Sequence, residues 1–73
     1  RMMAGRYVTN RIFRGKIVEE LRDAPEGLTR NVLGERVCID WSSKHHDKWM
    51  QSILQKLTND KILQKCKQKY LLA

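Results

Sequence analysis

The chain has 73 residues, of which 41% are hydrophobic, and a formal net charge of +7. This length fits one domain near the lower limit for folding without a disulfide or metal, and the hydrophobic fraction excludes a disordered tail. Positive charge in such excess favours nucleic acid or an acidic surface as the partner.

The sequence predicts an intracellular protein, in the nucleus or the cytoplasm, with no membrane partner. No apolar run approaches the roughly 18 residues of a membrane span, and the N-terminus lacks the apolar core of a signal peptide. Cys38 and Cys66 have neither a CxxC spacing nor the density of a disulfide scaffold. We therefore expect both to be reduced core residues.

The chain divides into a short lead-in and one domain. Residues 1–8 are basic and show no clear hydrophobic period, so we expect a mobile or partly docked arm. Residues 9–73 carry the periodic apolar segments of the domain itself. Because the chain starts at Arg1 and ends within the apolar segment LLA, we expect this domain to belong to a longer protein.

A first helix is expected to begin at Thr9 or Asn10, either of which is an acceptable N-cap. Apolar residues then recur at the spacing of one buried helical stripe. These are Phe13, Ile17, Val18 and Leu21. Pro25 disfavours helix just before it and Gly27 supplies a turn, so the helix should end near Asp23.

A second, shorter helix is expected from Arg30 to about Val37, with Thr29 as its N-cap. Gly34 lies in its middle, where glycine costs about 1 kcal/mol relative to alanine. We expect this glycine to let another helix approach closely. In the connection that follows, Trp41 is expected to cover the core beside the start of a third helix.

The third helix, expected over residues 43–58, has two distinct faces when wound at about 100° per residue. Its apolar face comprises His46, Trp49, Met50, Ile53, Leu54 and Leu57. Its polar face comprises Lys44, Lys48, Gln51, Ser52 and Gln55. Asp47 is expected in the first turn, where it would suit the positive end of the helix dipole. The pattern predicts a helix that packs with one face and presents the other to a polyanion.

The last segment is compatible with either a helix or a pair of strands. A helix would align Ile62, Leu63, Cys66, Tyr70 and Ala73, giving an all-α domain of four helices. Strand alternation would put Lys65, Lys67 and Lys69 on one side, and Ile62, Cys66, Tyr70 and Leu72 mostly on the other. Periodicity does not decide between the helix and the strands. A hairpin would turn at Lys67-Gln68, which lacks the Gly or Asn that a two-residue hairpin favours.

This order of parts resembles the winged-helix domain over roughly residues 10–73. The resemblance is carried by Leu57 at the end of the third helix, the Asn59-Asp60 turn, Ile62-Leu63, the basic run from Lys65 to Lys69, and Tyr70 to Leu72. It favours the hairpin, and hence a small α+β fold of three helices with a short C-terminal wing. Asp60 or Lys61 stands where that superfamily often has a glycine.

The resemblance implies a double-stranded DNA-binding module, which would target a larger replication, repair or regulatory protein. The third helix would enter the major groove, with contacts from Ser43, Lys44, His45, Lys48, Gln51, Ser52 and Gln55. The wing would lie along phosphates through Lys65, Lys67, Gln68 and Lys69. Arg30, at the start of the second helix, would contact backbone oxygens.

Two other classes of partner remain open. Some winged helices dock proteins, and here an apolar patch of Trp41, Met2, Met3 and Tyr7 would serve that purpose. RNA binding ranks below both, because the sequence offers no exposed aromatic platform for single strands.

We expect the domain to catalyse no reaction and to bind neither a cofactor nor a metal. The obvious zinc ligands would be Cys38, His45, His46 and Cys66, but the adjacent histidines diverge by about 100° on a helix and the cysteines belong to other segments. The chain has no glycine-rich phosphate loop, and a domain this small seldom encloses a pocket for a small-molecule substrate.

Overall fold

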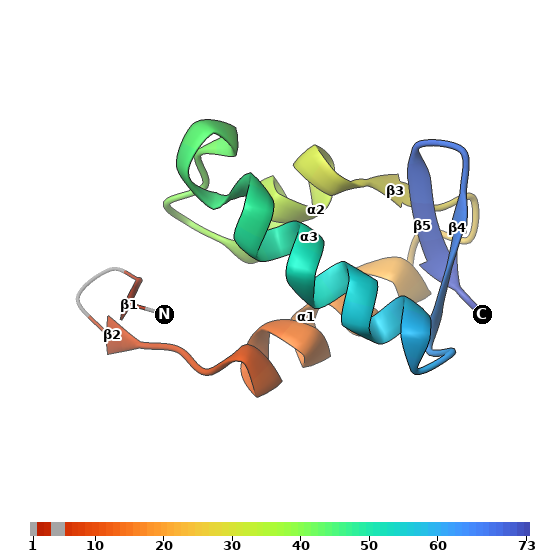
Figure 1. Cartoon of the computed structure of the whole chain (residues 1–73), viewed down its shortest axis with the longest axis horizontal. Coiled ribbons are helices and arrows are strands. Elements are labelled where there is room, and N and C mark those ends of the chain that lie inside the picture. Colours follow the sequence, from red (N-terminus) through yellow and green to blue (C-terminus); the bar gives the residue numbers. More distant parts are fainter. Residues whose placement is uncertain (1, 4–5) are drawn as a thin grey trace.

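A computed structural model of the chain describes residues 2–3 and 6–73, which form three helices and two small sheets. In chain order the elements are β1 (Met2–Met3), β2 (Arg6–Tyr7), α1 (Asn10–Arg22), β3 (Leu28–Thr29), α2 (Arg30–Val37), α3 (Ser43–Asn59), β4 (Leu63–Cys66) and β5 (Lys69–Leu72). Figure 1 shows the β1–β2 pair and the β4–β5 hairpin at opposite ends of the molecule, with the helices between them.

The two ends of α1 lie where the sequence predicts them. Thr9 is the N-cap, and its Oγ1 accepts a hydrogen bond from the backbone N–H of Ile12 at 3.3 Å. The turn beyond the helix requires Gly27, whose φ is +88° and whose missing Cβ would lie 2.9 Å from the carbonyl oxygen of Tyr70. This turn brings the chain back beside β5 and so fixes the position of α2 relative to the sheet.

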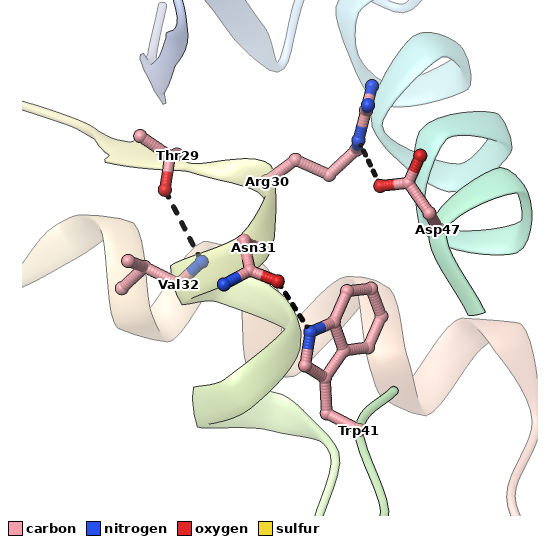
Figure 2. Close-up of polar contacts among 6 residues, drawn as sticks. All are labelled: Thr29, Arg30, Asn31, Val32, Trp41 and Asp47. Atoms are coloured by element: carbon pink, nitrogen blue, oxygen red, sulfur yellow. Dashed lines mark hydrogen bonds and ion pairs between the residues drawn. The ribbon is translucent and has the colours of Figure 1, made fainter. Parts of the chain in front are cut away.

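Helix α2 also begins and ends as predicted, with the Oγ1 of Thr29 accepting from the N–H of Val32 at 3.3 Å. Gly34 was expected to admit another helix, and that expectation is wrong. Trp41 occupies the space, and a Cβ on Gly34 would lie 2.4 Å from its indole ring. The indole Nε1 donates to Oδ1 of Asn31 at 2.9 Å (Figure 2). The ring packs against the core, as predicted.

Helix α3 runs one residue beyond the predicted end and buries Met50, Ile53, Leu54 and Leu57. Its first helical residue, Ser43, is the predicted one, but the contacts of its first turn differ from expectation. The N-cap is Ser42, which makes no side-chain cap, and the Ser42 N–H donates to Nδ1 of the half-buried His46 at 3.0 Å. The first turn contains no acidic residue. Asp47 lies farther along the helix, so its predicted pairing with the helix dipole is wrong.

The C-terminal segment forms an antiparallel hairpin, β4–β5, and β3 adds to it in the order β3-β5-β4. The α+β prediction is confirmed, and the four-helix alternative is excluded. Three helices and this sheet, whose strand β3 lies between α1 and α2 in the chain, form a small winged-helix-like domain. The hairpin turn is Lys67-Gln68, and Lys67 adopts a φ of 58° in place of the glycine that such a turn favours.

The predicted distribution of side chains on the hairpin is wrong in two respects. Lys65 pairs directly with Tyr70, so both lie on the same face, and the Lys65 Nζ is 5.6 Å from the centre of the tyrosine ring. Cys66 was expected in the core but is exposed, whereas Cys38 is buried. Neither cysteine forms a disulfide.

The core extends from the helices to the sheet and also includes part of the lead-in. Met3, in β1, is 8% exposed and belongs to the same hydrophobic cluster as Phe13 and Tyr70. No charged or polar side chain is buried among the described residues. None of the helices described combines the length and apolar character that a membrane crossing requires.

Candidate nucleic-acid interface

The solvent side of α3 carries all the residues predicted there for DNA contact. We call this set the α3 outer face, and it comprises Ser43, Lys44, His45, Lys48, Gln51, Ser52 and Gln55, each exposed. Trp49 holds the opposite side inward, with its ring edge-on to Phe13 at 4.7 Å between centroids. Because packing fixes the rotation of α3 in this way, its polar residues point into solvent.

The two lysines of the α3 outer face have no acidic partner in the part of the chain that the structure describes. Lys44 and Lys48 are therefore available to an external anion. Gln55 is partly engaged, since its Nε2 donates to Oδ1 of Asn59 at 3.0 Å. Gln51 has no such contact among the described residues, which leaves its whole amide open to a ligand.

The second cluster of predicted contacts is the hairpin tip, comprising Lys65, Lys67, Gln68 and Lys69, all exposed. Three of these four residues are lysines, and the tip contains no acid. Lys67 stands at the first position of the turn with a left-handed backbone, which a lysine adopts only at a cost in free energy. The tip thus retains a cation where glycine would be the less strained residue.

A cavity of about 260 Å³ joins the two clusters, and we call it the junction cavity. It is lined by Thr29, Arg30, Asn31, Ser43, Asp47, Lys65, Gln68 and Tyr70. Its walls come from the start of α2, the first part of α3 and the hairpin. The α3 outer face and the hairpin tip therefore meet at one recess.

Arg30 lies in the junction cavity as part of an ion pair. Its Nε donates to Oδ1 of Asp47 at 2.7 Å (Figure 2). The two side chains are 31% and 36% exposed. The sequence predicts a phosphate contact for Arg30 but gives no indication of its acidic partner. The two residues are 17 positions apart in the sequence, so no local spacing reveals the pair.

Two further cations, outside the set of contacts that the resemblance implies, lie on the other flank of α3. Arg14 of α1 and Lys56 of α3 line a second cavity, of about 170 Å³, together with Asn10, Ser52 and Ile53. Lys56 follows Ser52 by four residues, the spacing of neighbours on one helix face. This spacing could have identified Lys56 from the sequence, whereas the position of Arg14 depends on how α1 packs.

The residues considered for zinc are not brought together. Within the described ranges, no group of three or more His, Cys, Asp or Glu side chains is arranged to hold a metal ion. His45 is exposed, while His46 is half-buried and accepts the Ser42 N–H.

The apolar patch considered for a protein partner is only partly available. Met3 is buried, and Trp41 is half-buried against Gly34. The side chains of Met2 and Tyr7 lie outside the part of the chain whose burial is described.

Comparison with models of known families, with curated protein sequences and with solved structures gives no match for this chain.

Proposed function

We propose that this chain is a winged-helix module that binds double-stranded DNA inside the cell. Helix α3 would lie in the major groove, and the hairpin tip would follow the phosphate backbone. The observation that carries the proposal is the α3 outer face, where Lys44 and Lys48 are exposed and lack acidic partners among the described residues. The hairpin tip adds cations on the other side of the junction cavity.

The dimensions suit this mode of binding. Helix α3 has 17 residues, which at 1.5 Å per residue makes it about 26 Å long. The major groove of B-DNA is about 12 Å wide and admits one α-helix. A helix in the groove has the phosphate backbones on its two flanks, so side chains beside α3 are well situated for phosphate contacts.

Within the α3 outer face, different side chains suit different parts of the duplex. A glutamine pairs with adenine through both its amide oxygen and nitrogen, and Gln51 has both groups open among the described residues. Lys44 and Lys48 suit either phosphates or the acceptors of guanine. Ser43 and Ser52 suit phosphate oxygens at close range.

As a module, the domain would direct a larger replication, repair or regulatory protein to DNA. It would need no cofactor and carry out no reaction itself. Binding would depend steeply on salt, because each neutralised phosphate contributes about −0.9 to the slope of log K against log salt concentration.

The test compares two double variants that lower the net charge of +7 by the same amount, two units. One is Lys44→Ala with Lys48→Ala. The other is Lys16→Ala with Arg22→Ala, which removes two exposed cations of α1, a helix that packs under α3 through Phe13 and Trp49. Fluorescence anisotropy with a labelled duplex, measured at several salt concentrations, reports affinity and salt slope together.

The α3 variant should bind roughly tenfold more weakly and lose about 1.8 from the magnitude of the salt slope. The α1 variant should change both much less. Equal effects would show that only net charge matters and would remove α3 from the interface. If the unaltered protein fails to bind duplex DNA at low salt, that result would favour the alternative in which the domain docks a protein partner.

A further inference from the structure

The junction cavity contains one acidic residue, Asp47, among its eight lining residues. A carboxylate repels phosphate, so an acid beside a DNA-binding surface weakens binding unless it performs another task. An ion pair with side chains 31% and 36% exposed contributes little to folding. Asp47 therefore needs an explanation other than stability or direct attraction of DNA.

The geometry of the pair supplies one. Asp47 accepts a single hydrogen bond from Arg30, through Nε, at 2.7 Å. Figure 2 shows the two outer nitrogens of the guanidinium on the side of Nε away from the carboxylate. Those two Nη groups have no hydrogen-bond partner among the described residues. They retain the paired N–H groups that bind two oxygens of one phosphate.

Building on the proposed function, we infer that Asp47 is a positioning residue that orients Arg30 to grip one backbone phosphate of the duplex in the junction cavity. Lys65 and Gln68 line the same cavity from the hairpin and supply further donors to that phosphate. An arginine side chain loses much rotational freedom when it binds. Asp47 fixes the guanidinium in advance, so less of that freedom is lost on binding.

The ligand is a phosphate and not a base because of where Arg30 lies. It is the first residue of α2, off the α3 outer face, and it shares its cavity with the hairpin. A side chain flanking a groove-bound helix meets the sugar-phosphate backbone. The contribution of Asp47 should consequently be the same for duplexes of unrelated sequence.

If Asp47 positions Arg30, the Asp47→Ala change should lower the affinity for DNA, whereas electrostatics alone predicts that it should raise that affinity. This change removes a negative charge, raising the net charge by one unit from +7, so electrostatics alone predicts tighter binding. Positioning predicts weaker binding, by roughly three- to tenfold, because Arg30 is no longer held. Asp47→Asn keeps an oxygen that accepts the Arg30 Nε–H, so it should bind at least as tightly as the unaltered protein.

A double-variant comparison connects the effect to Arg30. Arg30→Lys removes the two-pronged donor while keeping the charge, and it should weaken binding about as much as Asp47→Ala. Combining the two should add little beyond either change alone, because both disrupt one contact. Circular dichroism confirms that each variant is folded, and two unrelated duplexes test independence from sequence.

Weaker binding by Asp47→Ala, retained binding by Asp47→Asn and non-additivity with Arg30→Lys would support the inference. Tighter or unchanged binding by Asp47→Ala would overturn it, as would full additivity with Arg30→Lys. Failure of the proposed function looks different, since the Lys44 and Lys48 double variant would then bind as the α1 control does. If that double variant weakens binding while Asp47→Ala tightens it, only the role of Asp47 is refuted.

Discussion

Replacing Lys67 by glycine should stabilise the domain while weakening the proposed binding to DNA. Lys67 opens the hairpin turn with a φ of 58°. The left-handed backbone costs a side-chain-bearing residue about 1–2 kcal/mol, and glycine avoids that cost. Glycine also gives the unfolded chain more freedom, which offsets about 0.4–1 kcal/mol of the gain. From the midpoints of these two ranges, the net stabilisation should be about 0.8 kcal/mol, or about 3–6 °C in Tm for a domain of this size.

The chain contains a matched control for this change. Lys61 also has a left-handed backbone, with a φ of 63°, and lies in the turn between α3 and β4. Lys61→Gly therefore removes the same charge and relieves the same kind of strain. Strand β4, four residues long, separates the two turns by about 13 Å. That exceeds the screening length of about 8 Å at physiological salt, so the two lysines act independently on a ligand.

Both glycine variants should have a raised Tm by circular dichroism. Only Lys67→Gly should bind duplex DNA more weakly, by roughly three- to tenfold with a loss of about 0.9 from the salt slope. Equal weakening by both variants would refute a specific contact at the hairpin tip. A lower Tm for both variants would refute the strained backbone on which the prediction rests.

Of three glycine substitutions, two test the packing that holds α2 and the sheet in position, and the third is a control. Gly34→Ala should lower the free energy of unfolding by about 1–2 kcal/mol, because its Cβ would meet the Trp41 ring at 2.4 Å. Gly15→Ala, also in a helix but with nothing within 4 Å of its new Cβ, should raise that free energy by up to about 1 kcal/mol. Gly27→Ala should lower it by about 1–2 kcal/mol, since φ is +88° and the Cβ would lie 2.9 Å from the Tyr70 carbonyl oxygen. Urea unfolding followed by circular dichroism measures all three, and a stabilised Gly34 or Gly27 variant would contradict these contacts.

The helices were predictable because their boundary signals are local. Thr9 and Thr29 cap α1 and α2 through their hydroxyl groups, and Pro25 follows the end of α1 closely. Apolar spacing identified the buried side of α3 for the same reason. Such signals need only a few neighbouring residues, so they can be recognised without knowing the fold.

The hairpin was harder to predict because its turn lacks the usual residue. Lys67 adopts the left-handed conformation itself, so no glycine marked the turn. The two-residue turn also changes which residues share a face. It pairs an odd-numbered residue of β4 with an even-numbered residue of β5, as in Lys65 with Tyr70. Simple alternation carried through the turn therefore assigned Lys65 and Cys66 to the wrong sides.

One part of the candidate site could likewise be predicted from local sequence, and another part could not. Exposure of the α3 outer face followed from the period of one helix. The Arg30–Asp47 pair, the junction cavity and the position of Arg14 depend on how separate elements pack, which no spacing in the sequence specifies. The role expected of Gly34 was wrong for that reason too, since its neighbour is a loop tryptophan and not a helix.

The proposed function requires α3 to present its outer face to duplex DNA. The most direct measurement is a titration of ¹⁵N-labelled protein with a short duplex at low salt, followed by amide and side-chain NH₂ resonances. We predict the largest shifts at Lys44, Lys48 and the Gln51 side chain, with a second group at the hairpin tip. Shifts confined to α1 would contradict the proposed interface. So would a titration in which neither the α3 outer face nor the hairpin tip shifts as the duplex is added.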